Sequence, residues 1–401
     1  MAMPAAPQSP LFTKEFYTSL FENTDGENIK TCLQCASCSG VCPFGHVMDF
    51  PPGRMIAWMR AGILEEMLES DSVWMCVSCY ACTEVCPKEI PVTPALMTRA
   101  KEEVLLAGNV PAELQHALEF SQRYGNPLGE SPRKRAAWTE DLDFKVPTVR
   151  EVKRPFDVLW FVGDYASYHP RVQEVTKAFA KLLNILEIDF AILGKAESSD
   201  GDSQRLAGEK GLFEVLAEKN AKAFGKCEFN EIITTDPHAY NALKNEYPKL
   251  GIEYPVRHYT EFLLERLDEI KPLLKENGKI RVTYHDPCYL GRVNDIYEQP
   301  RALLEAIPGL ELVEMAHNKT TSLCCGGGGG GMWLDGFRWE KAEARLSEWR
   351  MREAATAAVD VLALACPYEP PRFEDAAKAV KGAEEIVVKD IIELLVEAME
   401  E

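Results

Sequence analysis

A cysteine pattern that occurs twice near the N-terminus constrains this chain more than any other feature. Each copy reads C-x2-C-x2-C-x3-C-P, and the copies span residues 32–43 and 76–87. Four thiolates at this spacing match the ligands of a [4Fe–4S] cluster. A structural zinc site also uses four soft ligands, but usually as two pairs across a longer gap. The pattern therefore predicts two [4Fe–4S] clusters, with structural zinc or disulfides as the alternative.

The order of the cysteines also predicts which of them share a cluster. In two-cluster ferredoxins the fourth cysteine of each run ligates the cluster of the other run. One predicted ligand set is therefore Cys32, Cys35, Cys38 and Cys86, and the other is Cys76, Cys79, Cys82 and Cys42. Apolar residues between the runs recur at helical spacing, namely Ile56, Met59, Ile63, Leu64 and Met67. A further helix is expected from Thr93-Pro94 to about Leu106.

The composition fits a globular protein of two or three domains. The chain has 401 residues, of which 46% are hydrophobic. We expect no signal peptide and no membrane span, since no apolar stretch approaches the roughly 18 residues that a span requires. Thirteen cysteines without an export signal indicate a reducing compartment and metal ligation. The net charge of -19 argues against nucleic acid as a partner. We therefore expect a cytoplasmic protein that contacts a membrane only through a partner.

From residue 157 onward the sequence alternates between strand and helix patterns. The preceding residues, 125–155, are rich in proline and charge, and we interpret them as a surface linker whose basic run at 133–135 is solvated. Strands are expected at 158–162, 190–193, 232–235, 280–284, 312–315, 361–365 and 386–388. Such alternation indicates α/β layers with largely parallel sheets.

The turns after these strands indicate an internal duplication. Three turns of the first half match three turns of the second at nearly constant separation, and the matched residues are Asp164 with Cys288, Asp200 with Cys325, and Asp236 with Cys366. Each turn follows a strand. Their side chains are therefore expected to converge at one edge of a sheet, where open α/β folds place their sites.

The second half carries motifs of a known family. The segment 284–288, then Cys324-Cys325-Gly326, then Cys366-Pro367 resemble the cysteine-rich "CCG" domain. This family includes the B and D subunits of heterodisulfide reductase, the iron–sulfur subunits of glycolate and lactate oxidases, and a component of the sulfite-reductase-linked membrane complex. The N-terminal part resembles the C subunit of heterodisulfide reductase. The whole chain thus resembles a fused C-plus-B, or D-type, protein of that enzyme.

The resemblance implies an α+α/β fold in four segments. Residues 1–124 would form an alpha-helical ferredoxin domain with two [4Fe–4S] clusters, and 125–155 the linker. Residues 156–275 would form a degenerate CCG half-domain, and 276–401 a CCG half-domain with cysteine ligands.

The first half departs from the family pattern, which expects five cysteines in each half as ligands of a noncubane iron–sulfur cluster. Its corresponding positions hold Asp164, Ser199, Asp200, Asp236 and Ala239. Carboxylates are poor ligands for an iron–sulfur core. This half is therefore expected to be a scaffold, with a hard cation bound by the aspartates as the alternative.

The second half keeps four of the five cysteines. They are Cys288, Cys324, Cys325 and Cys366, and Glu369 stands where the fifth would be. We expect a third iron–sulfur cluster there, cubane or noncubane, and four empty thiols are the alternative. His285 either serves that site or is a core or capping histidine. The six glycines at 326–331 are expected to let the backbone approach a cluster or substrate closely, and Cys227 is expected to be a free thiol.

The resemblance implies an electron-transferring oxidoreductase subunit, whose own catalysis is left open. Its partners would be a flavoprotein subunit, a membrane cytochrome b subunit or both, in a hetero-oligomeric complex. The CCG site would reduce a disulfide, which takes two electrons. Because the first half lacks thiols, the alternative is a non-catalytic relay in a hydroxyacid oxidase or in a flavin-bifurcating complex acting on acyl-CoA compounds. A structural subunit with vestigial sites is a third possibility.

Overall fold

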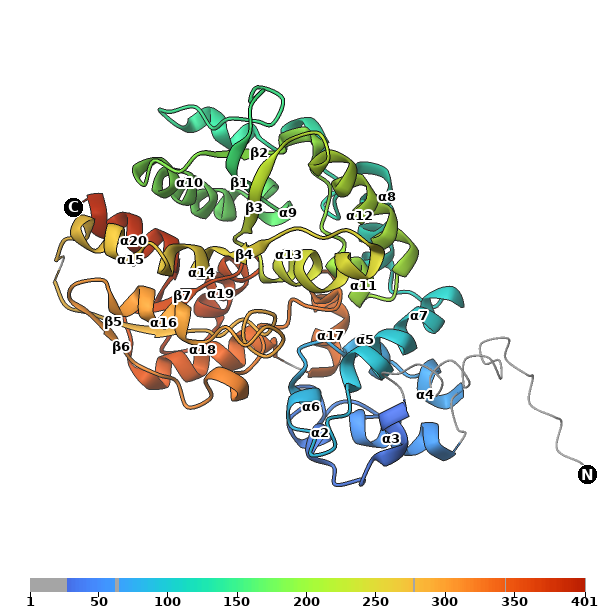
Figure 1. Ribbon diagram of the computed structural model, residues 1–401. Coiled ribbons are helices and arrows are strands. Elements are labelled where there is room, and N and C mark those ends of the chain that lie inside the picture. Colours follow the sequence, from blue (N-terminus) through green and yellow to red (C-terminus); the bar gives the residue numbers. More distant parts are fainter. Residues whose placement is uncertain (1–26, 62–64, 277, 343, 401) are drawn as a thin grey trace, which may run out of the picture.

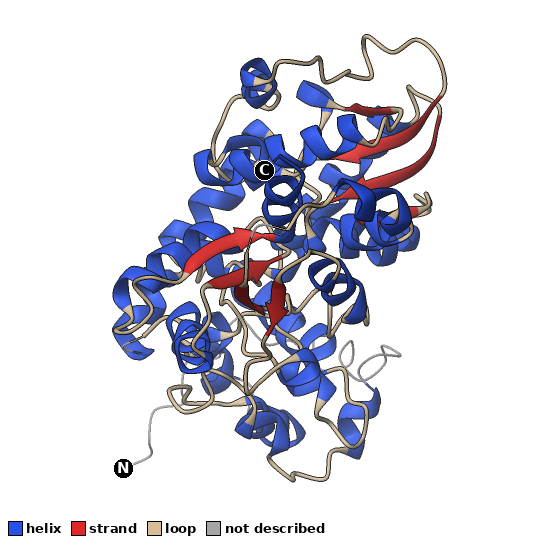
Figure 2. Ribbon diagram, turned by 90° about the vertical axis from the view of Figure 1, so that its left-hand side faces the viewer, coloured by secondary structure: helices blue, strands red, loops and turns tan. Residues whose placement is uncertain are grey.

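The computed structural model describes residues 27–61, 65–276, 278–342 and 344–400. The chain forms a helical N-terminal part and two α/β units, and the N-terminal part lies against the second unit and the lower side of the first (Figure 1). The strands fall into two separate groups with helices around them (Figure 2). The cysteine runs and the CCG motifs therefore lie in different parts of the fold, and contacts between those parts decide whether they form one site.

The N-terminal part consists of short helices and contains no strand in its described residues. The helices are η1 (Glu27–Thr31), α2 (Ser37–Gly40), α3 (Pro52–Ala61), α4 (Glu65–Glu69), α5 (Ser72–Met75), α6 (Ala81–Glu84), η2 (Val92–Met97), α7 (Thr98–Leu106) and α8 (Ala112–Tyr124). The predicted helix between the cysteine runs corresponds to α3 and α4. Its residues Ile56, Met59 and Met67 are buried together, whereas Ile63 and Leu64 lie outside the described residues.

Both α/β units contain four parallel strands in the same order. The first sheet runs β2-β1-β3-β4 and the second β6-β5-β7-β8. The strands are β1 (Phe156–Phe161), β2 (Phe190–Ile192), β3 (Phe229–Thr234), β4 (Val256–His258), β5 (Ile280–Tyr284), β6 (Leu310–Leu312), β7 (Val361–Leu364) and β8 (Val387–Asp390). Because strands at matching places in the chain occupy matching places in the sheets, the predicted duplication is confirmed.

Helices connect and cover the strands of both sheets. The α-helices are α9 (Asp164–Tyr168), α10 (Pro170–Ile185), α11 (Asp202–Leu206), α12 (Lys210–Phe224), α13 (Pro237–Asn241), α14 (Tyr259–Leu264), α15 (Leu267–Ile270), α16 (Glu298–Glu305), α17 (Asp335–Ala342), α18 (Leu346–Ala357), α19 (Glu369–Ala379) and α20 (Ile391–Glu400). Short helices of other types are η3 (Pro132–Lys134), η4 (Ala137–Asp141), η5 (Gly194–Ala196), η6 (Ala242–Glu246), η7 (Tyr247–Leu250), η8 (Lys271–Leu273), η9 (Lys319–Thr321) and η10 (Gly331–Trp333).

The two α/β units share one hydrophobic core. Phe179 on α10 and Leu395 on α20 belong to the same buried cluster. At the edge of this contact, the Arg171 guanidinium lies 2.8 Å from a carboxylate oxygen of Glu393. Burial of apolar side chains between α10 and α20 therefore holds the two sheets together.

Three details differ from the sequence predictions. β4 was not predicted, because it has only three residues and pairs with β3 alone. β6 ends at Leu312, where the predicted strand began, because its pairing with β5 covers only 310–312; Met315 is buried in the loop beyond. The segment 125–155, expected to be a surface linker, packs into the first unit instead, because Trp138 and Val146 are apolar and join its core. Within this segment Arg135, expected to be solvated, is buried because two carboxylates of the first unit bind its guanidinium.

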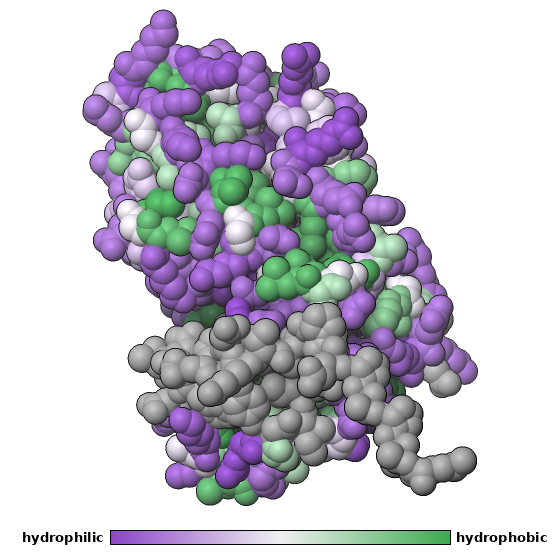
Figure 3. Space-filling model, turned by 90° about the vertical axis from the view of Figure 1, so that its right-hand side faces the viewer, coloured by the Kyte–Doolittle hydropathy of each residue, from purple (hydrophilic) through white to green (hydrophobic). Residues whose placement is uncertain are grey.

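The surface carries a groove between the α7–α8 region and α12. The face shown in Figure 3 is largely hydrophilic with hydrophobic side chains scattered over it. The groove is lined by Leu105, Val110 and Leu118 from the α7–α8 region and by Leu212 and Val215 from α12, and no cysteine lines it. Within the described ranges, none of the helices has both the length and the hydrophobicity needed to cross a membrane.

Candidate iron–sulfur sites

The eight cysteines of the two runs line two separate cavities, four cysteines to each. The outer cavity is lined by Cys32, Cys35, Cys38 and Cys86. The inner cavity is lined by Cys42, Cys76, Cys79 and Cys82. The fourth cysteine of each run thus faces the cavity of the other run, which is the grouping that the two-cluster rule predicts.

The backbone of the two cysteine loops has the same unusual conformation. Gln34 and Ala36 have φ values of 57° and 63°, and the corresponding Ser78 and Tyr80 have 52° and 62°. Residues other than glycine adopt this left-handed backbone conformation at a cost of about 1–2 kcal/mol each. In each loop it directs an amide at a thiol: the N–H groups of Gln34 and Ser78 each donate to the cysteine Sγ two residues earlier, at 3.4 Å.

The spread of the thiols distinguishes a cluster from a single metal ion. Four thiolates around one zinc ion, with bonds of about 2.3 Å, would stand about 4 Å from one another. Among the described residues, however, no three cysteine sulfurs form a group compact enough to hold one metal ion. Four thiols that line one cavity without forming such a group fit the ligands of a polynuclear cluster better than those of one ion.

The CCG cysteines lie at the carboxyl edge of the second sheet. Cys288 follows β5, Cys324 and Cys325 follow β6, and Cys366 follows β7. All four are buried. The Cys324 thiol interacts with those of Cys288 and Cys325. The predicted convergence of these residues is therefore observed.

The inner cavity adjoins the CCG cysteines. The Cys324 thiol also interacts with that of Cys79, a lining residue of the inner cavity, and this hydrogen bond lowers the pKa of Cys79 to about 6. Cys79, Cys288 and Cys324 belong to one buried cluster of side chains. Cysteines that are more than 200 positions apart in the sequence thus form one continuous group.

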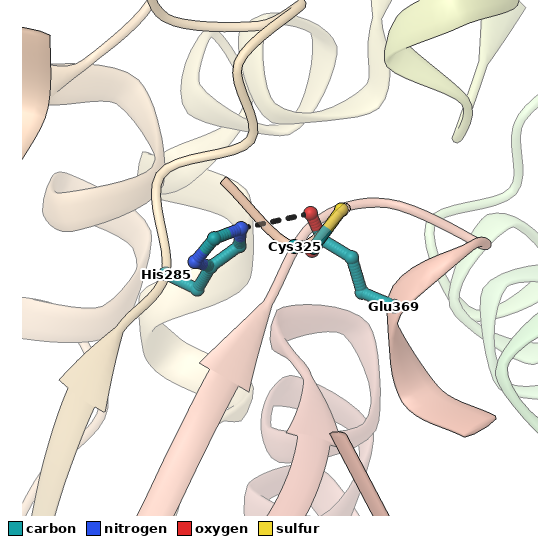
Figure 4. A group of neighbouring side chains, drawn as sticks. All are labelled: His285, Cys325 and Glu369. Atoms are coloured by element: carbon teal, nitrogen blue, oxygen red, sulfur yellow. Dashed lines mark ion pairs between the residues drawn. The ribbon is translucent and has the colours of Figure 1, made fainter. Parts of the chain in front are cut away.

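Glu369 occupies the place of the missing fifth cysteine. Its carboxylate, the Cys325 Sγ and a His285 nitrogen lie within 4.8 Å of one another (Figure 4). The His285 Nε2 is 3.2 Å from a carboxylate oxygen of Glu369, and Arg350 Nε donates to His285 Nδ1 at 3.2 Å. Burial raises the pKa of Glu369 to about 7. The carboxylate thus faces the thiols and has a histidine partner, so both the ligand and the neighbour interpretations of Glu369 and His285 stay open.

The corresponding edge of the first sheet is built differently. Arg135 binds Asp164 at 2.6 Å and Glu197 at 2.8 Å, and Asp236 Oδ1 accepts the His238 amide at 2.8 Å as the cap of α13. Within the described part of the chain, the aspartates do not form a set of three ligands close enough to share one ion. The geometry therefore favours the scaffold interpretation over a hard cation.

The glycine run packs against the inner cysteine loop. A Cβ on Gly328 would lie 2.7 Å from the Val77 carbonyl oxygen, and one on Gly329 would lie 2.6 Å from Ser78 Oγ. Both distances are shorter than real Cβ contacts. Glycine is therefore required here for close approach of the backbone, and the surface it approaches is the loop around the inner cavity.

Three cationic residues at the inner cavity were not predicted from the sequence. Lys101 Nζ donates to the carbonyl oxygens of Cys76 at 2.9 Å and Gly329 at 2.8 Å, and burial lowers its pKa to about 8. Arg292 Nε donates to the Cys79 carbonyl at 2.8 Å. Arg338 Nη2 donates to the carbonyl oxygens of Trp74 on α5, at 2.9 Å, and of Cys76, at 3.4 Å. Sequence gives no signal for them, because their partners lie far away in the chain. Cys227, in contrast, lies half-buried beside the core of the first unit, as a thiol outside both cavities.

Comparison with known proteins identifies both cysteine regions. Residues 28–90 match the model of the 4Fe-4S dicluster domain. Residues 158–244 and 282–368 each match the model of the cysteine-rich domain CCG. Of the two CCG matches, 282–368 contains Cys288, Cys324, Cys325 and Cys366, and 158–244 contains none of these cysteines.

Three curated relatives extend the comparison. The probable iron-sulfur-binding oxidoreductase FadF of Bacillus subtilis is 38% identical over 308 residues, which cover 74% of this chain and 42% of FadF. The EtfAB:quinone oxidoreductase of Syntrophomonas wolfei is 33% identical over 351 residues, 85% of this chain and 48% of that protein. The D subunit of the dihydromethanophenazine:CoB–CoM heterodisulfide reductase of Methanosarcina barkeri is 32% identical over 285 residues, 69% of this chain and 66% of that relative.

The chain spans about half the length of the first two relatives, 42% and 48%. The matches to the dicluster domain and to two CCG domains nevertheless cover both regions that the sequence and the fold single out. This chain therefore belongs to the iron–sulfur proteins that combine a 4Fe-4S dicluster domain with a duplicated cysteine-rich CCG domain, and it is homologous to the D subunits of heterodisulfide reductases and to FadF-like oxidoreductases.

Proposed function

We propose that this chain is an electron-transfer subunit of a multi-subunit oxidoreductase. The observation that carries the proposal is the contact between Cys79 of the inner cavity and Cys324 of the CCG cysteines. In this proposal Cys32, Cys35, Cys38 and Cys86 hold one [4Fe–4S] cluster, and Cys42, Cys76, Cys79 and Cys82 hold a second. Cys288, Cys324, Cys325 and Cys366 hold a third iron–sulfur group. Bound groups of this kind exchange single electrons, so three of them in sequence would form a path through the chain.

The protein's own residues define the two ends of that path. Cys35 is exposed, and the neighbouring Leu33 has 63% of its side chain exposed, so the outer cavity lies at the surface. All four CCG cysteines are buried, and the inner cavity has two buried and two half-buried cysteines. We infer that a partner exchanges electrons with the chain at the outer cavity, and that the CCG cysteines are the buried end.

The relatives support the kind of complex but leave its members as proposals. One relative is named as a subunit of a heterodisulfide reductase and another as an oxidoreductase for EtfAB and quinone. By analogy we propose a flavoprotein partner, a membrane cytochrome b partner or both, in a cytoplasmic or membrane-bound complex.

A second candidate function is a relay without its own catalysis. It is favoured by the first half, in which Arg135 and Asp164 form an ion pair where the family has thiols. A disulfide substrate that needs two CCG clusters would find only one here. Chemical reduction of the purified chain with a thiol disulfide present separates the two functions, because only a disulfide reductase would release free thiols.

The cluster assignment is tested by paired cysteine variants. In anaerobically purified protein, Cys32→Ser and Cys86→Ser should change the same spin-resonance signal, because both cysteines line the outer cavity. Cys42→Ser should change the other signal, because Cys42 lines the inner cavity. Cys227→Ser is the matched control and should change neither signal. Zinc in place of iron, or a common signal for Cys32→Ser and Cys42→Ser, would contradict the assignment.

A further inference from the structure

Three cations, two of them buried, contact the backbone of cysteines that line the inner cavity, and no described carboxylate forms an ion pair with them. Lys101 has none of its surface exposed and Arg338 only 3%, and Arg292 is half-buried. In the part of the chain that the structure describes, none of the three forms an ion pair with a carboxylate; each instead donates to a carbonyl oxygen of Cys76 or Cys79. Buried charges are normally paired. Three unpaired ones on the same loop indicate that a negative group belongs beside it.

Lys101 is held in its charged form by its contacts. Its Nζ donates to the carbonyl oxygens of Cys76, Gly329 and Leu206, at 2.9, 2.8 and 3.3 Å. An ammonium group has three N–H donors and no acceptor, so three carbonyl acceptors match the protonated amine. The same contacts join the inner cysteine loop, the glycine run and the first α/β unit at one atom.

Arg338 also lacks partners for part of its guanidinium. Its Nε and Nη1 are buried and have no hydrogen-bond partner within the described residues. Its guanidinium lies 5.8 Å from the ring centre of Phe44, which lines the inner cavity. Donors left unsatisfied in an interior are costly, so this side chain also fits a site that holds a negative group.

The outer cavity provides a comparison within the same molecule. At the position that corresponds to Cys76, the Cys32 carbonyl accepts a hydrogen bond from Arg60 at 2.8 Å, and Arg60 is exposed. The amide-to-thiol contacts are equal in the two loops, 3.4 Å in each. Lys88, which lines the outer cavity, is exposed as well. The cations at the outer cavity are therefore screened by solvent, whereas Lys101 and Arg338 beside the inner cavity are not.

We propose that Lys101, Arg292 and Arg338 raise the reduction potential of a cluster in the inner cavity above that of a cluster in the outer cavity. The inference rests on the proposed function, since it requires both clusters. A cluster becomes more negative when it is reduced, so a nearby unscreened cation stabilises the reduced form, and net charge and solvent exposure are what set such potentials. Burial alone would lower the inner potential, so the proposal requires the contribution of the three cations to be larger than that of burial. Electrons would then pass from the surface inward, toward the CCG cysteines.

The test is an anaerobic redox titration of the full chain, followed by the spin-resonance signals assigned with the cysteine variants. In the unchanged protein the inner cluster should have the higher potential. Lys101→Met should decrease the equilibrium constant for reduction of the inner cluster at least tenfold, which is about 59 mV for one electron. The outer cluster of the same molecules should be unchanged, and Lys101→Arg should restore the inner potential.

Arg60→Met is the matched control, because it removes a cation from the corresponding carbonyl of the outer loop. It should shift the outer potential less than Lys101→Met shifts the inner one, since Arg60 is exposed. If Lys101→Met does not assemble the inner cluster, Arg292→Met takes its place with the same expected direction. A lower inner potential in the unchanged protein, or equal shifts of both clusters, would overturn the inference. Absence of either cluster from the unchanged protein would instead refute the proposed function.

Discussion

Replacement of Arg135 by methionine should destabilise the first α/β unit far more than expected for a residue of a solvated basic run. The Arg135 guanidinium lies 2.6 Å from Asp164 and 2.8 Å from Glu197, and all three side chains are at most 5% exposed. Removing one member of a buried ion pair costs about 3–5 kcal/mol, because the remaining charge stays buried without compensation. Methionine keeps much of the length of the side chain, so the loss reports on charge more than on packing.

The neighbouring contacts set the magnitude within that range. Glu197 keeps two hydrogen bonds, from the amides of Val162 and Gly163 at 3.1 and 2.9 Å, so its carboxylate remains partly satisfied. Asp164 loses its ion pair entirely. We therefore expect a loss of about 3–4 kcal/mol in the free energy of unfolding, near the lower end of the range for a broken buried pair.

The pH dependence of this loss provides a second readout. Burial already raises the pKa of Asp164 and of Glu197, and removal of Arg135 should raise both further. A carboxyl group whose folded pKa exceeds its unfolded value contributes stability at low pH and loses it as the pH rises. The deficit of Arg135→Met should therefore be smaller at pH 5 than at pH 8.

Urea unfolding under anaerobic conditions measures the effect, with tryptophan fluorescence as the probe because Trp138 and Trp160 are buried in this unit. Arg154→Met is the matched control. Arg154 also pairs with a carboxylate, Asp189 at 2.5 Å, but its side chain is 63% exposed, and exposed pairs contribute little. If the two variants lost equal stability, or if Arg135→Met lost less than about 1 kcal/mol, the buried ion pair would not be what stabilises this unit.

Three further predictions follow from single side chains. Burial raises the pKa of Asp390 to about 8, well above the usual value of about 3.9. The urea midpoint of unfolding should therefore fall as the pH rises toward 8, and Asp390→Asn should reduce that fall. A midpoint that rises from pH 6 to pH 9 would contradict this. Gly329→Ala places a Cβ 2.6 Å from Ser78 Oγ at a φ of +60° and should diminish the inner-cluster signal before the outer one, whereas Gly336→Ala, with nothing within 4 Å of the added carbon, should change neither. Glu369→Gln should alter the spin-resonance signal of the CCG site, and an unchanged signal would make Glu369 a neighbour of four thiolate ligands.

The sequence predicted features that depend on spacing along the chain. The grouping of Cys42 and Cys86 with the opposite runs follows from the order of cysteines, and the structure places them in those cavities; binding of iron by these residues stays a prediction. The placement of the CCG cysteines at one sheet edge follows from the repeated turns. Both signals are local or periodic, so a single sequence contains them.

Features that depend on tertiary contacts could not be read in this way. Lys101 looks like an ordinary lysine of a helix until Leu206 and Gly329 are placed beside it, 105 and 228 positions further along the chain. Arg135 is part of a basic run of the kind that is usually solvated, and its acidic partners lie 29 and 62 positions away. In both cases the charge is explained by groups that only the fold brings together.

The contacts between the two sheet edges give a physical role to the half that has no cysteine at its turns. The His238 ring of the first unit stacks on Tyr289, next to Cys288, with ring centres 4.0 Å apart, and Ser203 Oγ lies 3.1 Å from the Tyr368 hydroxyl, two residues beyond Cys366. The first unit therefore covers the CCG cysteines from one side, while the glycine run and the inner cysteine loop cover them from the other. Clustered thiolates are susceptible to oxidation when they are accessible. The first half therefore has a structural role whether or not it binds a group of its own, because its buried polar edge helps to exclude solvent from the CCG cysteines.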